Sequence, residues 1–152
     1  MYAVRRWSVR HARGLNAFYR GFEALLIRMH GVWKAIGYQR ADRPVAVVER
    51  IVKGFLFDCQ MCGQCVLSAT GMSCPMNCPK NLRNGPCGGV RDNGHCEVKP
   101  EMMCVWVEAY AGAKRIPGGL AALREVQKPV DRRLEGHSSW LRIAQEKAES
   151  RP

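Results

Sequence analysis

The chain has 152 residues and a mass of 17.1 kDa, which is too small for a complete cofactor-dependent barrel or dinucleotide-binding enzyme. Its 24 Lys and Arg outnumber 13 Asp and Glu, and the resulting formal net charge of +11 predicts an anionic partner or an acidic protein surface. Hydrophobic residues make up 47% of the chain, which excludes wholesale disorder, and the apolar runs are shorter than the roughly 20 residues of a membrane span.

The first 57 residues are predicted to form a basic, helical extension, with 11 basic and 3 acidic side chains. Ser8 is a candidate N-cap and Gly37 a candidate end of one long helix. The helix carries a stripe of apolar residues along one side. Such a stripe more commonly packs on the chain's own core, but so short a chain offers little core, which favours docking of the stripe on a partner subunit. The apolar stripe recurs at steps of three and four: Leu15, Phe18, Phe22, Leu25, Leu26, Met29, Val32, Trp33 and Ile36.

A second helix is predicted to begin at Asp42, because Pro44 suits the first turn of a helix. A short strand at residues 45–48 is the alternative. After the cysteines, residues 102–113 and 120–127 predict short helices on either side of a Pro-Gly-Gly break, and a last helix follows Ser138.

The predicted fold class is therefore mainly α with irregular loops. A small Cys-rich metal-cluster domain at residues 58–104 is flanked by the N-terminal extension, residues 1–57, and by a helical C-terminal segment, residues 105–152. No secretory signal is visible, so we expect a cytoplasmic, reducing location. Clustered thiols are there more often metal ligands than disulfides.

All eight cysteines are candidate metal ligands. The Cys59-x-x-Cys62-x-x-Cys65 spacing turns successive sulfurs toward one centre and is typical of iron-sulfur clusters. Eight residues then separate Cys65 from Cys74, unlike the bacterial ferredoxin run, so the spacing leaves open which distant cysteine completes the set. The candidates are Cys59, Cys62, Cys65, Cys74, Cys78, Cys87, Cys96 and Cys104.

Eight thiolates match two 4Fe-4S clusters, while one 4Fe-4S cluster plus one zinc ion, or zinc alone, are the alternatives. His95 is a weaker candidate ligand, and His11, His30 and His137 are predicted to be surface or packing residues. A thioredoxin-like pair at Cys59 and Cys62 is disfavoured by the third cysteine and by the missing βαβ pattern.

No catalytic residue is predicted in this chain. It has no Gly-rich phosphate loop after a strand, no nucleophile elbow and no convincing acid/base pair. The N-terminal aromatic residues share the apolar face instead of interleaving with the charges, which disfavours nucleic-acid binding. Binding of the basic helix to a membrane surface is a further, weaker alternative.

The cysteine region resembles a known family. Four segments between Phe57 and Tyr110 resemble the small cysteine-rich subunit, or C-terminal domain, associated with bacterial methylenetetrahydrofolate reductases. These segments are FDCQMCGQC, CPMNCPKNLRNGPCGGV, NGHCEV and CVWVEAY. The resemblance is specific because the CPKN and NGPCGG words match together with the cysteine spacing. Residues 138–140, Ser-Ser-Trp, are a weaker match.

The resemblance implies an iron-sulfur electron-transfer subunit that docks on a separate barrel subunit containing FMN. The partner's flavin would interconvert methylene- and methyl-tetrahydrofolate, the eight cysteines would hold clusters that relay electrons, and a ferredoxin-like protein is a possible electron carrier. The resemblance implies no catalytic or folate-binding residue here, so we expect no activity from the chain alone. The alternatives are a structural zinc-binding subunit of the same reductase and a zinc-dependent nucleic-acid-binding protein.

Overall fold

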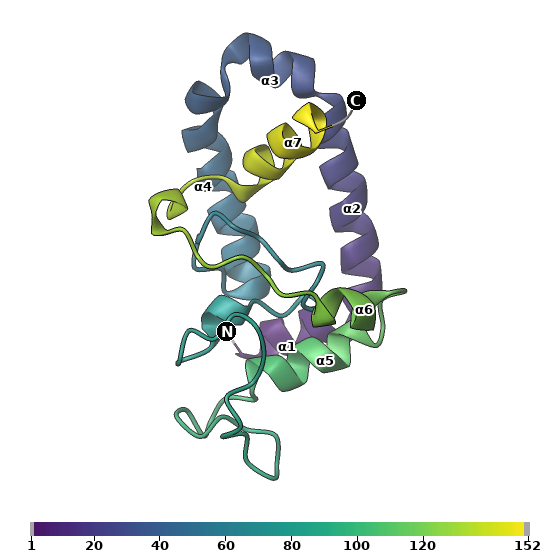
Figure 1. Cartoon of the computed structure of the whole chain (residues 1–152), viewed down its shortest axis with the longest axis vertical. Helices are drawn as coiled ribbons and strands as arrows, with labels where there is room; N and C mark the ends of the chain where they lie inside the picture. Colours follow the sequence, from purple (N-terminus) through teal and green to yellow (C-terminus); the bar gives the residue numbers. More distant parts are fainter. Residues whose placement is uncertain (1, 151–152) are drawn as a thin grey trace.

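The computed structural model describes residues 2–150, and Figure 1 shows a frame of N-terminal helices that carries a long irregular segment. Two isolated β-bridges occur and no sheet forms within residues 2–150, so the predicted mainly α fold is confirmed. None of the helices in this range is both long and apolar enough to cross a lipid bilayer. The helices are α1 (Tyr2–Arg10), α2 (Ala12–Arg28), α3 (His30–Ile36), α4 (Tyr38–Phe57), α5 (Val105–Ala113), α6 (Gly119–Arg124) and α7 (Ser139–Glu149), with 3-10 turns η1 (Pro75–Asn77) and η2 (Arg132–Leu134).

The single long helix predicted between Ser8 and Gly37 is wrong, because the chain forms three helices there. The first break is at His11, whose Nδ1 lies 2.9 Å from the Trp7 carbonyl oxygen. The second follows the last turn of α2, where the Trp33 indole donates a hydrogen bond to the Leu26 carbonyl at 3.1 Å. Only the predicted end is right: α3 stops before Gly37, whose φ of 90° suits glycine.

Ser8, the predicted N-cap, lies inside α1 and serves a different purpose. Its side chain is fully buried, and its Oγ donates a hydrogen bond to the Leu56 carbonyl in α4 at 2.8 Å. This bond fastens α1 to the last turn of α4, immediately before the first cysteine.

The predicted start of the second helix at Asp42 is also wrong, as is the alternative strand at residues 45–48. Helix α4 begins at Tyr38 and continues through Pro44. The Asp42 carboxylate accepts a hydrogen bond from the backbone N–H of Ser138 at 2.9 Å and contacts His137 Nδ1 at 2.7 Å. Asp42 therefore satisfies the backbone just ahead of α7 instead of capping its own helix.

The helices predicted after the cysteines are confirmed with shifted ends. Helix α5 begins at Val105 rather than at residue 102, and α6 ends at Arg124 rather than at residue 127. Ser138 caps α7, since its Oγ accepts a hydrogen bond from the backbone N–H of Leu141.

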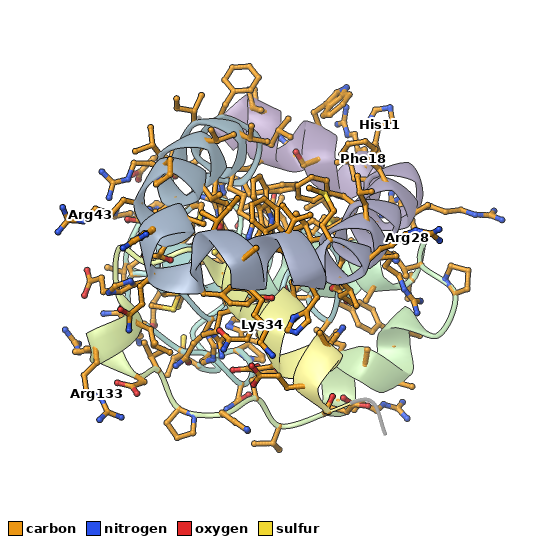
Figure 2. The ribbon with its side chains drawn as sticks, turned by 90° about the horizontal axis from the view of Figure 1, so that it is seen from above. His11, Phe18, Arg28, Lys34, Arg43 and Arg133 are labelled. Carbon is orange, nitrogen blue, oxygen red and sulfur yellow. The ribbon has the colours of Figure 1, made fainter. Side chains whose placement is uncertain are left out.

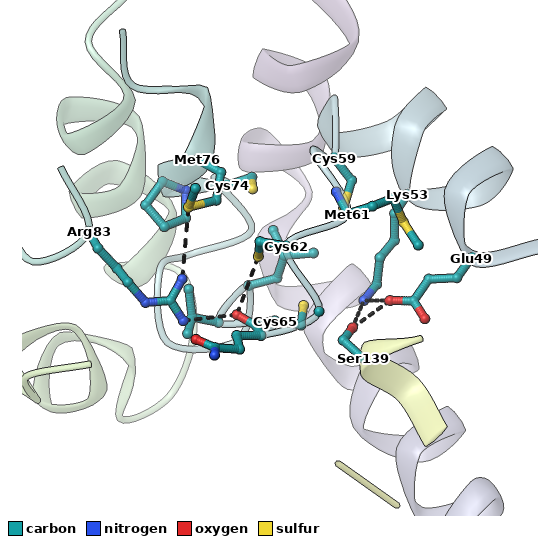
Figure 3. A pocket seen from close by; sticks show the side chains of 15 residues that line it. Glu49, Lys53, Cys59, Met61, Cys62, Cys65, Cys74, Met76, Arg83 and Ser139 are labelled. Atoms are coloured by element: carbon teal, nitrogen blue, oxygen red, sulfur yellow. Dashed lines mark hydrogen bonds and ion pairs between the residues drawn. The ribbon is translucent and has the colours of Figure 1, made fainter. Parts of the chain in front are cut away.

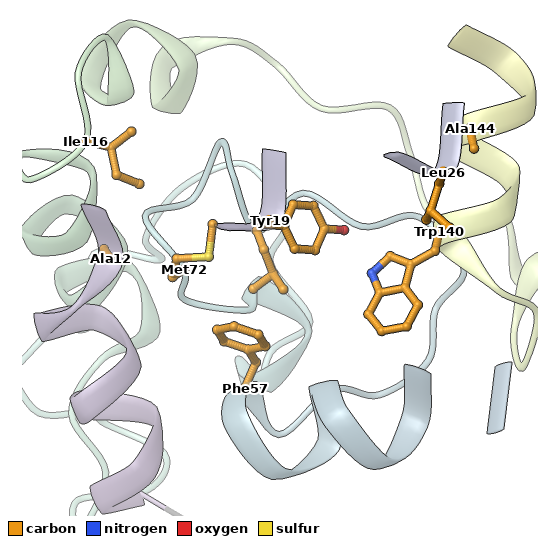
Figure 4. Close-up of a cluster of buried hydrophobic side chains, with 9 residues drawn as sticks. Ala12, Tyr19, Leu26, Phe57, Met72, Ile116, Trp140 and Ala144 are labelled. Carbon is orange, nitrogen blue, oxygen red and sulfur yellow. The ribbon is translucent and has the colours of Figure 1, made fainter. Parts of the chain in front are cut away.

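The main hydrophobic core lies where α2, α4 and α7 meet the cysteine-rich segment (Figure 4). Phe22 and Trp140 pack edge to face, with ring centroids 4.9 Å apart. Four of the nine stripe residues thus pack on the chain's own core, while Phe18, Leu25, Val32 and Ile36 remain exposed. The buried members come from all three predicted segments: Ala12, Tyr19, Leu26, Phe57, Leu67, Met72, Ile116, Trp140 and Ala144.

A glycine-to-glycine contact holds the cysteine-rich segment against α5. A Cβ on Gly112 would overlap the carbonyl of Gly71, and a Cβ on Gly71 would overlap the backbone of α5. Gly71 also has φ of 59°, in the left-handed region. Only glycine at both positions permits this approach.

We expect Gly112→Ala to lower the free energy of unfolding by about 2–3 kcal/mol, because the added methyl must push two backbones apart. Urea denaturation followed by circular dichroism measures the change. The matched control is Gly14→Ala in α2, where the new Cβ meets no atom within 4 Å, and which should stabilise by about 0.5–1 kcal/mol. Equal effects of the two substitutions would contradict the proposed contact.

Candidate metal centre

Four of the eight candidate cysteines line one cavity. Cys59, Cys62 and Cys65 reach it from the loop after α4, and Cys74 reaches it from the residue before η1 (Figure 3). All eight cysteines are free thiols. The structure thus brings Cys74 to the same cavity as the triplet.

The loop that carries the triplet turns through unusual backbone conformations. Asp58 and Met61 adopt positive φ of 53° and 49°, and Gly63 adopts 70°. Left-handed conformations cost on the order of 1 kcal/mol for residues other than glycine, and they concentrate at functional sites. A side chain on Gly63 would also overlap Leu134, so this turn needs glycine. The turns bring the sulfurs to one side of the loop.

Two groups donate hydrogen bonds to these sulfurs. The Tyr19 hydroxyl donates to Cys65 Sγ at 3.2 Å, and the backbone N–H of Met61 donates to Cys59 Sγ at 3.4 Å. Donors aimed at sulfur stabilise negative charge on a thiolate ligand. Sequence analysis missed Tyr19, which lies 46 residues before Cys65.

Burial disfavours ionisation of two of these thiols, Cys59 and Cys74. Burial raises the pKa of the Cys59 thiol to about 11, although the Met61 N–H partly opposes the shift. The pKa of Cys74 is raised further, by burial and by the neighbouring Cys59. Binding of a metal or cluster would therefore displace protons from this site.

A buried lysine faces the same cavity. The Lys53 side chain is only 1% exposed, and its Nζ donates hydrogen bonds to Glu49 at 2.7 Å and to Ser139 Oγ at 2.8 Å. Burial alone would lower the pKa of Lys53, but Cys65, Tyr19 and Glu49 outweigh burial and raise it. Lys53 is therefore a buried cation beside the thiols.

The carboxylate that accompanies Lys53 is held by the start of α7. Glu49 accepts hydrogen bonds from Ser138 Oγ at 2.7 Å and from the backbone N–H of Trp140 at 3.2 Å, and also from Ser139 Oγ. Lys53 Nζ further lies 5.1 Å from the centroid of the Trp140 ring. These contacts tie α4 and α7 together next to the cavity.

Arg83 is the second cation in the lining. It is 9% exposed and donates to the Gln64 carbonyl at 2.9 Å, within the triplet loop. Its Nε is buried and has no hydrogen-bond partner. Buried donors are rarely left unsatisfied, so an anionic group in the cavity would complete its environment.

The other four cysteines, Cys78, Cys87, Cys96 and Cys104, are absent from the lining of this cavity. Cys87 is exposed, and its Sγ lies 3.6 Å from a Glu97 carboxylate oxygen. His95 Nδ1 lies 2.6 Å from the Pro100 carbonyl, and His137 contacts Asp42. Within residues 2–150, no three His, Cys, Asp or Glu side chains lie close enough together to hold a single metal ion.

Comparisons with known proteins give one result. A family model described as methylene-tetrahydrofolate reductase C terminal matches residues 38–133, which include α4, all eight cysteines, α5 and α6. No curated protein matches the chain, and no solved structure matches it.

Proposed function

Since the chain belongs to the methylene-tetrahydrofolate reductase C-terminal family, we propose that it is an iron-sulfur subunit that relays electrons to or from the flavin of a reductase catalytic subunit. The observation that carries this proposal is the cavity lined by four thiols and by the buried side chains of Lys53 and Arg83. We expect FMN and the folate substrate on the partner subunit, and a ferredoxin-like protein as a candidate electron carrier.

We assign a 4Fe-4S cluster to Cys59, Cys62, Cys65 and Cys74, whose thiols line the same cavity; the cluster would supply one-electron transfer when bound. Such a centre with four thiolates carries a net charge of about −2, which Lys53 and Arg83 would offset. We assign Cys78, Cys87, Cys96 and Cys104 to a second cluster. Tyr19 and the Met61 N–H would stabilise charge on the ligating sulfurs.

A single zinc ion is the alternative occupant of this cavity. Zinc with Zn–S bonds of about 2.3 Å needs ligand sulfurs about 3.8 Å apart, whereas a cubane binds each thiolate through a different iron and so holds its ligand sulfurs farther apart. The acid-labile sulfide content of the protein distinguishes the two.

The test is the iron, zinc and acid-labile sulfide content of the protein purified anaerobically with its flavin-containing partner. Two clusters predict about eight iron and eight sulfide per chain, with visible and EPR spectra that change on addition of dithionite. Mixing the reduced complex with methylene-tetrahydrofolate should reoxidise the clusters, because its reduction to methyl-tetrahydrofolate consumes two electrons. Zinc without sulfide would contradict electron transfer and leave a structural subunit.

A further inference from the structure

Helix α4 buries two charged side chains and exposes several large apolar ones. On the inner face, Glu49 and Lys53 are each about 1% exposed. On the outer face, Ile51 is 67% exposed and Phe55 66% exposed. A helix that covers only its own core has the opposite arrangement. The outer face is therefore built for contact with another molecule.

The exposed residues form one continuous stripe along the helix. Positions 48, 51, 52 and 55 are related by steps of three and four residues, about one helical turn, and residue 47 extends the stripe. Trp7 on α1 is exposed as well, and so is Phe18 on α2 (Figure 2). We call the stripe on α4 the α4 outer face; it consists of Val47, Val48, Ile51, Val52 and Phe55.

The exposed charge of helices α1–α4 is one-sided, and three of the exposed arginines, Arg40, Arg43 and Arg50, lie on α4 itself. In α1–α4 the three acidic side chains are all paired within the chain: Glu23 with Lys147, Asp42 with His137, and Glu49 with Lys53. Figure 2 shows Arg28 and Arg43 extending away from the ribbon. The exposed cations of these helices are Arg6, Arg10, Arg13, Arg20, Arg28, Lys34, Arg40, Arg43 and Arg50.

This charge distribution limits what can cover the face. A second copy docked through the same helix would bring its arginines against these arginines, which is unfavourable. A partner with carboxylates around an apolar patch would be complementary. Four of the five residues are β-branched and lose little rotamer freedom when packed, which suits a closely fitted protein surface better than fluid lipid.

We propose that the α4 outer face binds a different folded protein, through an apolar patch bordered by carboxylates. The inference rests on the proposed function in one respect: it takes the reductase catalytic subunit as that protein. The inference goes beyond the proposed function because it assigns the contact to α4, whereas the sequence predicted docking through the apolar stripe at residues 15–36.

The experiment uses the double variant Ile51→Asp/Phe55→Asp, co-expressed with the reductase catalytic subunit of the same organism. We expect loss of co-elution in size-exclusion chromatography and a dissociation constant weaker by on the order of 100-fold or more, because two exposed apolar anchors become charged. The matched control is Val126→Asp, which places the same charge at an 85% exposed residue outside α1–α4 and should bind like the wild type. Circular dichroism checks that each variant is folded.

Three results would overturn the proposal. The double variant could bind the catalytic subunit as tightly as the wild type. The isolated wild type could be a dimer that the double variant converts to a monomer. The wild type could instead fail to bind the catalytic subunit and sediment with phosphatidylserine vesicles, with the double variant losing this vesicle binding.

Iron and sulfide content, measured on the same samples, separates this inference from the proposed function. Complex formation that depends on α4 but contains no iron would refute electron transfer and leave the docking face standing. Clusters present in a complex that tolerates the double variant would refute the docking face alone.

Discussion

Lys53→Met is expected to lower the free energy of unfolding by about 3–5 kcal/mol. The substitution leaves the Glu49 carboxylate buried without its cation, although both serine hydroxyls still donate to it. Removing one partner of a buried ion pair is strongly destabilising because the remaining charge is uncompensated. Urea denaturation of the anaerobically purified protein, followed by circular dichroism, measures the change.

Two controls separate loss of the charge pair from loss of packing. The double variant Lys53→Met/Glu49→Gln removes both charges and should recover most of the lost stability. Lys34→Met changes an exposed lysine on α3 and should stay within about 0.5 kcal/mol of the wild type. If the single Lys53 variant were as stable as the double variant, the ion pair would not matter for folding.

Cys74→Ser is expected to remove about four of eight iron atoms per chain, with the matching sulfide and EPR signal. The reason is its place in the cavity with Cys59, Cys62 and Cys65. Site formation and folding are coupled, so soluble yield should fall as well. Metal and sulfide analysis, combined with EPR after dithionite reduction, gives the result.

The comparison variant for this prediction is Cys87→Ser, which changes an exposed cysteine outside the cavity lining. It should remove the other half of the iron and leave the EPR signal that Cys74→Ser abolishes. Full iron content in Cys74→Ser would refute the assignment of Cys74 to the triplet. Identical residual spectra from the two variants would refute the division into two sets.

Much of the secondary structure follows from local sequence. Ser138 was predicted to precede a helix and caps α7, and the apolar run after the last cysteine forms α5. The errors occur where a residue has two possible partners. Asp42 is a residue type that often caps helices, but its carboxylate accepts a hydrogen bond from the backbone N–H of residue 138, 96 positions away. Local patterns contain no information about such distant partners.

The candidate site, too, was predictable from local sequence only in part. The triplet spacing predicted that three sulfurs converge, and the structure places them on one cavity. Cys74, Lys53 and Arg83 join the triplet through the fold, so spacing could not identify them. Helix α4 carries several charged residues, and hydrophobicity cannot show that Glu49 and Lys53 are the buried ones, because it treats every charged residue as exposed.

Helix α4 also fixes how far an electron would have to travel. Lys53 faces the cysteine cavity and Phe55 lies on the opposite side of the same helix. An α-helix with its side chains is about 10–12 Å across, so a protein bound to the outer face is at least one helix diameter from the cavity. Tunnelling rates fall exponentially with distance, and this thickness is a constant part of the path. A partner would therefore exchange electrons rapidly across α4 only if its own redox group lies just beneath the surface that contacts the helix.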